Sequence, residues 1–230
     1  MTTDTSVQAM NAAQARGVAQ ALLPPRWYGN RWDYYYALSK LRSDPLYPGV
    51  LSALRGTTAP VLDLGCGLGL LAHALHHDGQ QQRYRGVDND AAKIQRGQRY
   101  AATLPHAQLE WMDLSREQPE HSGSVAILDV LQYLDTPTQQ GVLTRAAGQL
   151  TGDGRLVIRV SLADTSGRGR TSRVSDRLAK AIGWMQSTPR SYPSAEFFLD
   201  TLTDVGVDAQ IRPLFGRTPF NNWLIVGQRR

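Results

Sequence analysis

The sequence is poor in cysteine, in lysine and in long apolar runs. Cys66 is its single cysteine, so no disulfide can form within the chain. One cysteine also rules out the paired Cys/His spacing of zinc sites. Although His73, His76 and His77 share one predicted helix, we interpret them as surface and boundary residues. We therefore predict no metal site.

Long apolar runs are absent as well. No stretch approaches the roughly 20 apolar residues that cross a bilayer, and we predict no membrane span. The opening residues 1–5 have neither the basic start nor the apolar core of a signal peptide. These two features favour a cytoplasmic location.

Lysine is scarce, and the positive charge comes almost wholly from arginine. The formal net charge is +5 and the sequence pI is about 9.6, which raises the question of nucleic acid. The arginines are spread along the chain, however, and the densest group is only Arg168, Arg170 and Arg173. We interpret the charge mainly as a solvated surface, so a nucleic-acid partner is predicted to be unlikely.

A glycine-rich turn stands at the centre of the sequence pattern. The apolar run 61–64 predicts a buried strand, and the periodic segment 68–75 predicts a helix. Glycines occupy alternate positions between them: Gly65, Gly67 and Gly69. Such a turn offers backbone N–H groups to a ligand at the carboxyl end of a parallel sheet. A dinucleotide site would need a further glycine where this chain has Leu70.

Alternating strands and helices follow the turn. The predicted strands after the first are 84–88, 109–114, 124–134 running into a loop, 155–160, 207–215 and 223–227. A short link joins the last two strands, so we predict an antiparallel hairpin at the end of the sheet.

The predicted domain organisation has two parts. Residues 1–56 form an N-terminal helical extension that acts as a lid, and residues 57–230 form the α/β domain. The segment of about 161–193 is rich in Ser, Gly and Arg, and we predict a lid insertion there because such long irregular segments are usually functional.

The string Asp63-Leu64-Gly65-Cys66-Gly67-Leu68-Gly69 closely resembles the first motif of class I S-adenosylmethionine-dependent methyltransferases. The resemblance implies an α/β fold with a seven-stranded, mostly parallel Rossmann-like sheet in the order 3-2-1-4-5-7-6. Its last strand is antiparallel, and helices cover both faces. It also implies S-adenosylmethionine as the cofactor.

The resemblance assigns cofactor-binding roles residue by residue. Asp63, Gly65 and Gly67 would bind the methionine part, with Gly69 supporting the turn; Asp88 would bind the ribose and Asp113 the adenine, between Met112 and Leu114; Asp129 and Val130 would flank the sulfonium; Cys66 and Asn89 complete the set. Asp113 has an alternative role, because an aspartate there can simply cap the following turn.

The acceptor site is predicted from aromatic and basic residues near the same sheet edge: Tyr36, Lys40, Phe215, Phe220 and Asn221. Related methyltransferases often carry a histidine where this chain has Gln132, and the substitution removes an obvious general base. Tyr133 is the candidate catalytic residue. The pattern is similar to small-molecule methyltransferases of bacterial polyketide or pigment pathways, which implies O-methylation of a small aromatic or acyl-linked metabolite.

Two other functions remain open at this stage. A nucleic-acid (RNA) methyltransferase would use the basic surface, but amino-methylases resemble Asn/Asp-Pro-Pro-Tyr after the fourth strand, where this chain has Asp129-Val130-Leu131-Gln132. A non-catalytic scaffold that only binds the cofactor is the other alternative. The oligomeric state stays open, with a homodimer possible.

Overall fold

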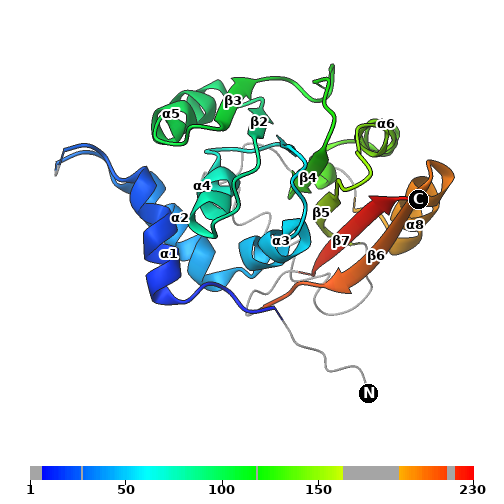
Figure 1. Ribbon diagram of the computed structural model, residues 1–230, viewed down its shortest axis with the longest axis horizontal. Coiled ribbons are helices and arrows are strands. Elements are labelled where there is room, and N and C mark those ends of the chain that lie inside the picture. The colour runs from blue at the N-terminus through cyan, green and yellow to red at the C-terminus, as the bar shows by residue number, and fades with distance from the viewer. Residues whose placement is uncertain (1–6, 27, 118, 163–191, 217–220) are drawn as a thin grey trace.

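The computed structural model of the protein describes residues 7–26, 28–117, 119–162, 192–216 and 221–230. Most of the predicted insertion at 161–193 lies outside these described residues, as does Phe220. Figure 1 shows a central sheet with helices packed on both of its faces.

One seven-stranded sheet organises the fold, in the order β3-β2-β1-β4-β5-β7-β6. The strands are β1 (Val61–Leu64), β2 (Tyr84–Asp88), β3 (Ala107–Trp111), β4 (Ser124–Leu128), β5 (Leu156–Ser161), β6 (Val207–Pro213) and β7 (Asn222–Arg229). Strands β1 to β5 pair in parallel, and β7 runs antiparallel to both β5 and β6. The predicted strand order and the closing hairpin are therefore confirmed.

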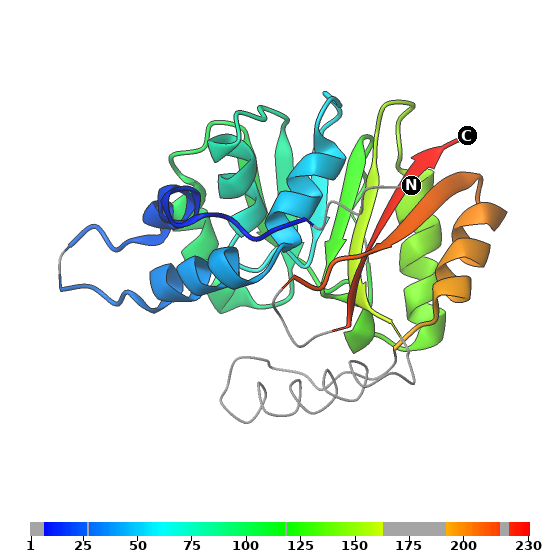
Figure 2. The same cartoon turned by 90° about the horizontal axis from the view of Figure 1, so that it is seen from below.

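The helices form two layers around this sheet. The described helices are α1 (Ala12–Ala19), η1 (Gln20–Leu22), α2 (Trp32–Ser43), α3 (Leu46–Leu54), α4 (Leu70–His77), α5 (Ala91–Ala101), η2 (Leu131–Tyr133), α6 (Thr136–Gly148) and α8 (Ala195–Asp204). Figures 1 and 2 show α1 to α5 on one side of the sheet and α6 with α8 on the other. None of the helices in the described ranges is long and apolar enough to cross a membrane.

Sequence chemistry explains where several helices begin. Asp90 caps α5 by accepting a hydrogen bond from the backbone N–H of Lys93. Asp135 does the same for α6, and Ser194 for α8. A side-chain oxygen at the N-cap satisfies a backbone donor that the helix itself leaves unpaired.

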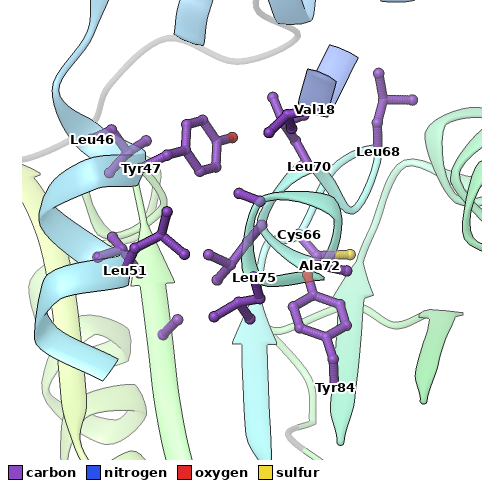
Figure 3. Packing of buried hydrophobic residues seen from close by; sticks show 14 of the residues in the cluster. Val18, Leu46, Tyr47, Leu51, Cys66, Leu68, Leu70, Ala72, Leu75 and Tyr84 are labelled. Atoms are coloured by element: carbon purple, nitrogen blue, oxygen red, sulfur yellow. The ribbon is translucent and has the colours of Figure 1, made fainter. Parts of the chain in front are cut away.

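The core consists of one hydrophobic cluster on each face of the sheet. The cluster on the α1–α5 side joins the N-terminal helices to α4, because Leu22, Leu41, Leu46 and Leu54 belong to it and each is at most 1% exposed. Figure 3 shows members of this cluster on α3, such as Leu46 and Leu51, beside Leu70 and Leu75 of α4. Strands β1 and β5 are buried along their whole length, as expected for parallel strands covered on both faces.

Strands β3 and β4 differ most from the predicted bounds. Strand β3 covers 107–111 rather than 109–114, so Met112, Asp113 and Leu114 lie in the loop that follows it. Strand β4 ends at Leu128 because Asp129 has a positive φ of 61°, which no extended strand accommodates. The apolar residues beyond Asp129 led us to predict a longer strand, but residues 131–133 form the short helix η2.

Candidate functional site

The glycine turn between β1 and α4 is anchored to the neighbouring strand β2. The backbone N–H groups of Gly65 and Cys66 both donate to the carbonyl oxygen of Val87, at 2.8 and 3.0 Å. The next free backbone donor, the N–H of Gly67, binds the Asp88 carboxylate at 2.9 Å. The turn is therefore held at the carboxyl edge, by which we mean the ends of β1, β2, β4 and β5.

Gly65 and Gly67 are required in this turn for different structural reasons. Both have positive φ, 85° at Gly65 and 57° at Gly67. A Cβ added at Gly65 would lie 2.2 Å from Cγ2 of Val130, which packs directly against the turn. A Cβ added at Gly67 would meet nothing within 4 Å. Gly65 thus allows close packing within the protein, whereas Gly67 leaves backbone open beside the turn, where a ligand can approach.

Asp63 is buried in β1, with 2% of its surface exposed. Its Oδ2 accepts a hydrogen bond of 2.6 Å from the Tyr84 hydroxyl. Its Oδ1 is buried with no hydrogen-bond partner, an arrangement that costs free energy until a donor arrives. Burial raises the pKa of Asp63 to about 7, although the Tyr84 hydrogen bond acts to lower it.

This raised pKa predicts a pH dependence of stability that depends on one residue. The Asp63 pKa is 3.8 in a model peptide and about 7 in the folded protein, so the folded state holds the proton more tightly. Stability should therefore fall as pH rises from about 4 to about 7, by at most about 1.4 kcal/mol per pH unit. Urea unfolding at several pH values, compared with Asp63→Asn, measures this. Parallel curves for the two proteins would show that Asp63 ionises normally.

Asp88 ends β2 beside the glycine turn and is half-buried. One carboxylate oxygen accepts from Gly67 N–H, and the other accepts from Asp90 N–H at 2.8 Å. The neighbouring Asn89 is exposed, and its carbonyl oxygen accepts a hydrogen bond from the Trp111 indole. Each carboxylate oxygen can accept a further hydrogen bond, so the ribose role predicted for Asp88 stays chemically possible.

Asp113 makes the contacts of a turn cap. Its Oδ1 accepts from both the backbone N–H and the hydroxyl of Ser115, at 3.0 and 2.7 Å. These hydrogen bonds hold the pKa of Asp113 below its usual value. The capping alternative therefore describes the structure as it stands, and adenine binding by Asp113, Met112 and Leu114 remains a prediction.

A partly buried ionic cluster lies where the N-terminal extension meets the carboxyl edge. It contains Lys40 of α2, Asp44 before α3, Asp129 after β4 and Arg159 of β5. The Arg159 side chain is 4% exposed; it binds Asp44 at 3.0 Å through Nη2 and Asp129 through Nη1. Lys40 Nζ lies 3.3 Å from Asp129 and 3.8 Å from Asp44. The two cations and two carboxylates balance.

This cluster fixes the charge state of the residue predicted to flank the sulfonium. Burial acts to raise the pKa of Asp129, but Arg159 and then Lys40 outweigh it, and the pKa is lowered. Burial acts to lower the pKa of Lys40, yet Asp129 raises it above its ordinary value. Asp129 is therefore an ionised carboxylate engaged by two cations, and it is a poor general base.

The other residues predicted for the acceptor site lie in differing environments. Tyr36 is 37% exposed on α2, and Phe215 packs edge-to-face on Trp223 with ring centroids 5.5 Å apart. Asn221 is only 2% exposed. Its amide donates to Leu162 and accepts from Trp223, so substrate contact would require these bonds to open.

The candidate catalytic residue Tyr133 lies at the end of η2, half-buried and directly after the carboxyl end of β4. Gln132 donates to the carbonyl oxygen of Asp129 at 3.1 Å, so it supports the loop where related proteins have histidine. None of the five histidines of the chain follows a strand: His106 and His121 precede β3 and β4, and the others lie on α4. No cluster of metal ligands occurs among the residues that the structure describes.

Three residues of this site were missed by the sequence reasoning: Asp44, Tyr47 and Arg159. A signal existed for Arg159, because a charged residue inside the apolar run 155–160 must find a partner when it is buried. Tyr47 of α3 is 7% exposed, and burial, together with the charges of Asp63 and Asp129, raises its pKa. Its position within the extension gave no hint of this.

A sheet in this order, with a glycine turn between β1 and α4 and an acid at the end of β2, defines a Rossmann-like methyltransferase fold. Residues 61–154 match the family model described as a methyltransferase domain. A search of curated proteins by sequence finds no match. The domain match covers the part of the chain from β1 to the turn before β5, which holds the glycine turn and Asp88.

Solved structures of several methyltransferases share this fold. Magnesium protoporphyrin IX methyltransferase from Synechocystis PCC 6803 aligns with a TM-score of 0.63 and 16% identity, covering 92% of each chain. Geranyl diphosphate methyltransferase aligns with a TM-score of 0.64 and 17% identity, over 98% of this chain and 97% of its own. The pyocyanin biosynthetic protein PhzM aligns with a TM-score of 0.65 and 20% identity, over 92% of this chain and 61% of its own.

Proposed function

We propose that the carboxyl edge of this sheet binds S-adenosylmethionine and that the protein transfers its methyl group to an oxygen atom of a small aromatic or acyl-linked metabolite. The observation that carries the cofactor part is the open backbone at Gly67 beside Asp88, and the unpaired Oδ1 of Asp63 in the strand before the turn adds to it. A dinucleotide is disfavoured because the motif has Leu70 in place of its last glycine.

The polar groups of the edge fit the parts of this cofactor. Its α-ammonium group needs an acceptor, and Asp63 Oδ1 is a buried acceptor without a donor. Its ribose hydroxyls need acceptors, which the Asp88 carboxylate offers. Its adenine would lie against the 112–114 loop, where Met112 and Leu114 are half-buried and border the core cluster of the α6 side.

Methyl transfer demands little side-chain chemistry of the protein. The sulfonium supplies a good leaving group when the cofactor is bound. The residues of this chain would then hold the acceptor in line, exclude water and receive a proton where necessary. The buried turn, the ionic cluster and the N-terminal helices are suited to positioning and exclusion.

The need to remove a proton from the acceptor restricts which acceptor groups can be methylated. Asp129 is engaged by Arg159 and Lys40, and no histidine follows a strand at the carboxyl edge. An acceptor oxygen that already ionises near neutral pH, in an acidic phenol or a carboxylic acid, is therefore favoured over an aliphatic alcohol. The similarity of the fold to that of mitomycin 7-O-methyltransferase supports the same substrate class.

The rival functions find less support. An RNA methyltransferase of the amino-methylating kind would be expected to have Asn/Asp-Pro-Pro-Tyr after β4, where this chain has Asp129-Val130-Leu131-Gln132. A scaffold without catalysis needs only the cofactor site. Methylation of a panel of phenols, carboxylic acids and RNA, measured with radiolabelled cofactor, separates the three: label in a small molecule is expected, label in RNA would overturn the acceptor class, and no label at all would favour the scaffold.

Cofactor binding is tested by calorimetry with S-adenosylhomocysteine and with NAD under the same conditions. We expect the first to bind with a micromolar dissociation constant, equivalent to about −8 kcal/mol, and NAD not to bind. Asp88→Ala should weaken binding at least about tenfold, because it removes both the ribose acceptor and the anchor of Gly67. Asp78→Ala, an acid at the far end of α4, is the control and should bind normally. Unchanged affinity in Asp88→Ala would refute the ribose role, and binding of NAD alone would overturn the cofactor assignment.

A further inference from the structure

Exposed apolar side chains gather in one short stretch of the chain. Seven large hydrophobic side chains are exposed among the described residues, and five of them lie between positions 23 and 36: Leu23, Tyr28, Trp32, Tyr35 and Tyr36. Trp32 and Tyr35 are 60% and 57% exposed. They are three positions apart on α2, so they share one face of the helix. Single exposed hydrophobic residues are ordinary, but a concentration of them marks an interaction surface.

This stretch projects from the body of the molecule. Figures 1 and 2 both show the link between η1 and α2 extending beyond the helices and away from the sheet. Helix α2 begins at Trp32, directly after this link, so Trp32 and Tyr35 lie in the turn of the helix next to the projection. We call residues 23–35 the docking end. Its apolar side chains lie on a projecting surface, which suits a broad, soft partner.

The same part of the molecule is strongly basic. Residues 12–43 and α5 together contain eight lysines and arginines and one acid, so they carry a formal charge of +7, whereas the whole chain carries +5. Helix α5 lies beside α2, because Arg96 and Tyr100 both bind Asp33 of α2, at 2.9 and 2.8 Å. Asp33 is the one acid, and it is 8% exposed and paired with Arg96. Arginines that are scattered in the sequence therefore meet here with no exposed acid among them.

Positive charge also lies directly beside an exposed aromatic ring. The guanidinium of Arg26 lies over the Tyr28 ring, 5.8 Å from its centroid, and donates a hydrogen bond of 2.8 Å to the Tyr28 hydroxyl. Tyr28 is 63% exposed. The docking end therefore combines aromatic and cationic groups within one surface.

An anionic lipid surface complements this combination. Trp and Tyr side chains are favoured at the level of the lipid headgroups, and arginines are attracted to anionic lipids. Single-stranded nucleic acid also binds aromatic and basic residues, but it follows a groove, whereas these side chains lie on a projection. We propose that the docking end binds the surface of an anionic lipid bilayer, with Trp32 and Tyr35 in the headgroup region.

The docking end adjoins the carboxyl edge of the sheet. Lys40, on the same helix as Trp32 and Tyr35, binds Asp129 after β4. A bilayer bound to the docking end would therefore lie near the edge at which the proposed reaction takes place. The inference goes beyond the proposed function and does not depend on it, because lipid binding requires neither cofactor nor acceptor.

Binding of the full chain to vesicles tests the proposal. Sedimentation with vesicles of phosphatidylcholine and phosphatidylglycerol, and with vesicles of phosphatidylcholine alone, measures how much protein partitions onto lipid. We expect binding to the anionic vesicles that weakens as salt is added, because salt screens the charges, and much weaker binding to the neutral ones. No binding to the anionic vesicles, or equal binding to both kinds, overturns the proposal.

Variants then locate the surface. Trp32→Ser combined with Tyr35→Ser should weaken binding to anionic vesicles at least about tenfold, because two large apolar side chains no longer leave water. Arg26→Gln should weaken it about fivefold, the effect of one charge near an anionic surface. Leu199→Ser, at an exposed position of α8 on the other side of the sheet, is the control and should bind like the wild type. An aromatic double variant that binds like the wild type overturns the proposal.

The substitutions should leave the protein folded. Trp32, Tyr35 and Arg26 are exposed, and changes at exposed positions usually alter stability little. We therefore expect the melting temperature and the affinity for S-adenosylhomocysteine to match those of the wild type.

A conservative variant gives a readout that does not depend on the double variant. Vesicles with brominated lipid tails should quench the tryptophan fluorescence of the wild type, and Trp32→Phe should bind while losing most of that quenching. Equal quenching in the two proteins means that another face contacts the lipid, which overturns the proposal.

Two results would assign the docking end to another partner. One is binding of single-stranded RNA without binding of vesicles, lost in the aromatic double variant. The other is self-association in light scattering without binding of vesicles, lost in the same variant. The first would make the surface a nucleic-acid site and the second an interface between copies of the chain, and either overturns the proposal.

Discussion

Gly67→Ala is expected to lose cofactor affinity while keeping its fold. Gly65→Ala is expected to lose mainly folding stability. Both residues need a left-handed backbone, which costs an alanine roughly 1–2 kcal/mol. At Gly67 the added methyl group meets no protein atom and occupies the open side of the turn. At Gly65 it would lie 2.2 Å from Val130, and a β-branched side chain has few other rotamers to adopt.

The measurement pairs unfolding with binding. We expect Gly67→Ala to lose about 1–2 kcal/mol of unfolding free energy and at least about tenfold in affinity for S-adenosylhomocysteine, as the methyl group takes the space of a ligand atom. Gly65→Ala should lose clearly more stability, because Val130 and the start of the loop after β4 must move. Equal stability losses in the two variants would mean that the packing of Val130 adapts freely. Unchanged affinity in Gly67→Ala would mean that the ligand lies elsewhere.

The second large effect is expected at Arg159. Arg159→Met leaves Asp44 and Asp129 facing each other with only Lys40 between them. Removing one partner from a buried ion cluster costs about 3–5 kcal/mol, chiefly because the remaining charge stays buried and uncompensated. Chemical denaturation should therefore show a loss of this size, with the slope of the transition unchanged.

Two further variants test whether charge balance is the reason. Lys40→Met removes the more exposed cation and leaves Arg159 bound to both acids, so it should cost no more than about 1 kcal/mol. The double variant Arg159→Met with Asp44→Asn restores one cation to one acid and keeps an acceptor for the Leu46 N–H. It should recover part of the loss. A double variant as unstable as Arg159→Met alone would assign the cost to packing rather than to charge.

Local patterns predicted the frame of the fold because they depend on neighbours in the chain. The strand–glycine–helix pattern at 61–77 placed β1 and α4, and the short link before Asn222 implied the closing hairpin. The position of Asp88 beside the turn also followed, since parallel strands end at one edge. In each case the decisive contacts lie within one strand or between strands that the pattern itself identifies.

Contacts between residues far apart in the chain could not be predicted from the sequence. Arg159 and Asp44 are 115 positions apart and meet only because α3 packs against β5. Asp113 could not be assigned, because a cap and an adenine ligand require the same residue type at the same place. Tyr47 was hidden among the many aromatics of the extension, and only its burial in the structure set it apart.

The shared cluster between the N-terminal helices and α4 has a kinetic consequence. Leu22, Leu41, Leu46 and Leu54 are at most 1% exposed, and each exposure to water would cost about 1.5–3 kcal/mol. Lifting the whole extension at every turnover would add several kcal/mol to the barrier for ligand exchange and slow release by orders of magnitude. We therefore expect α1 to α3 to stay in place as a wall, in contrast to the lid predicted for residues 1–56, and ligands to enter and leave by smaller movements around them.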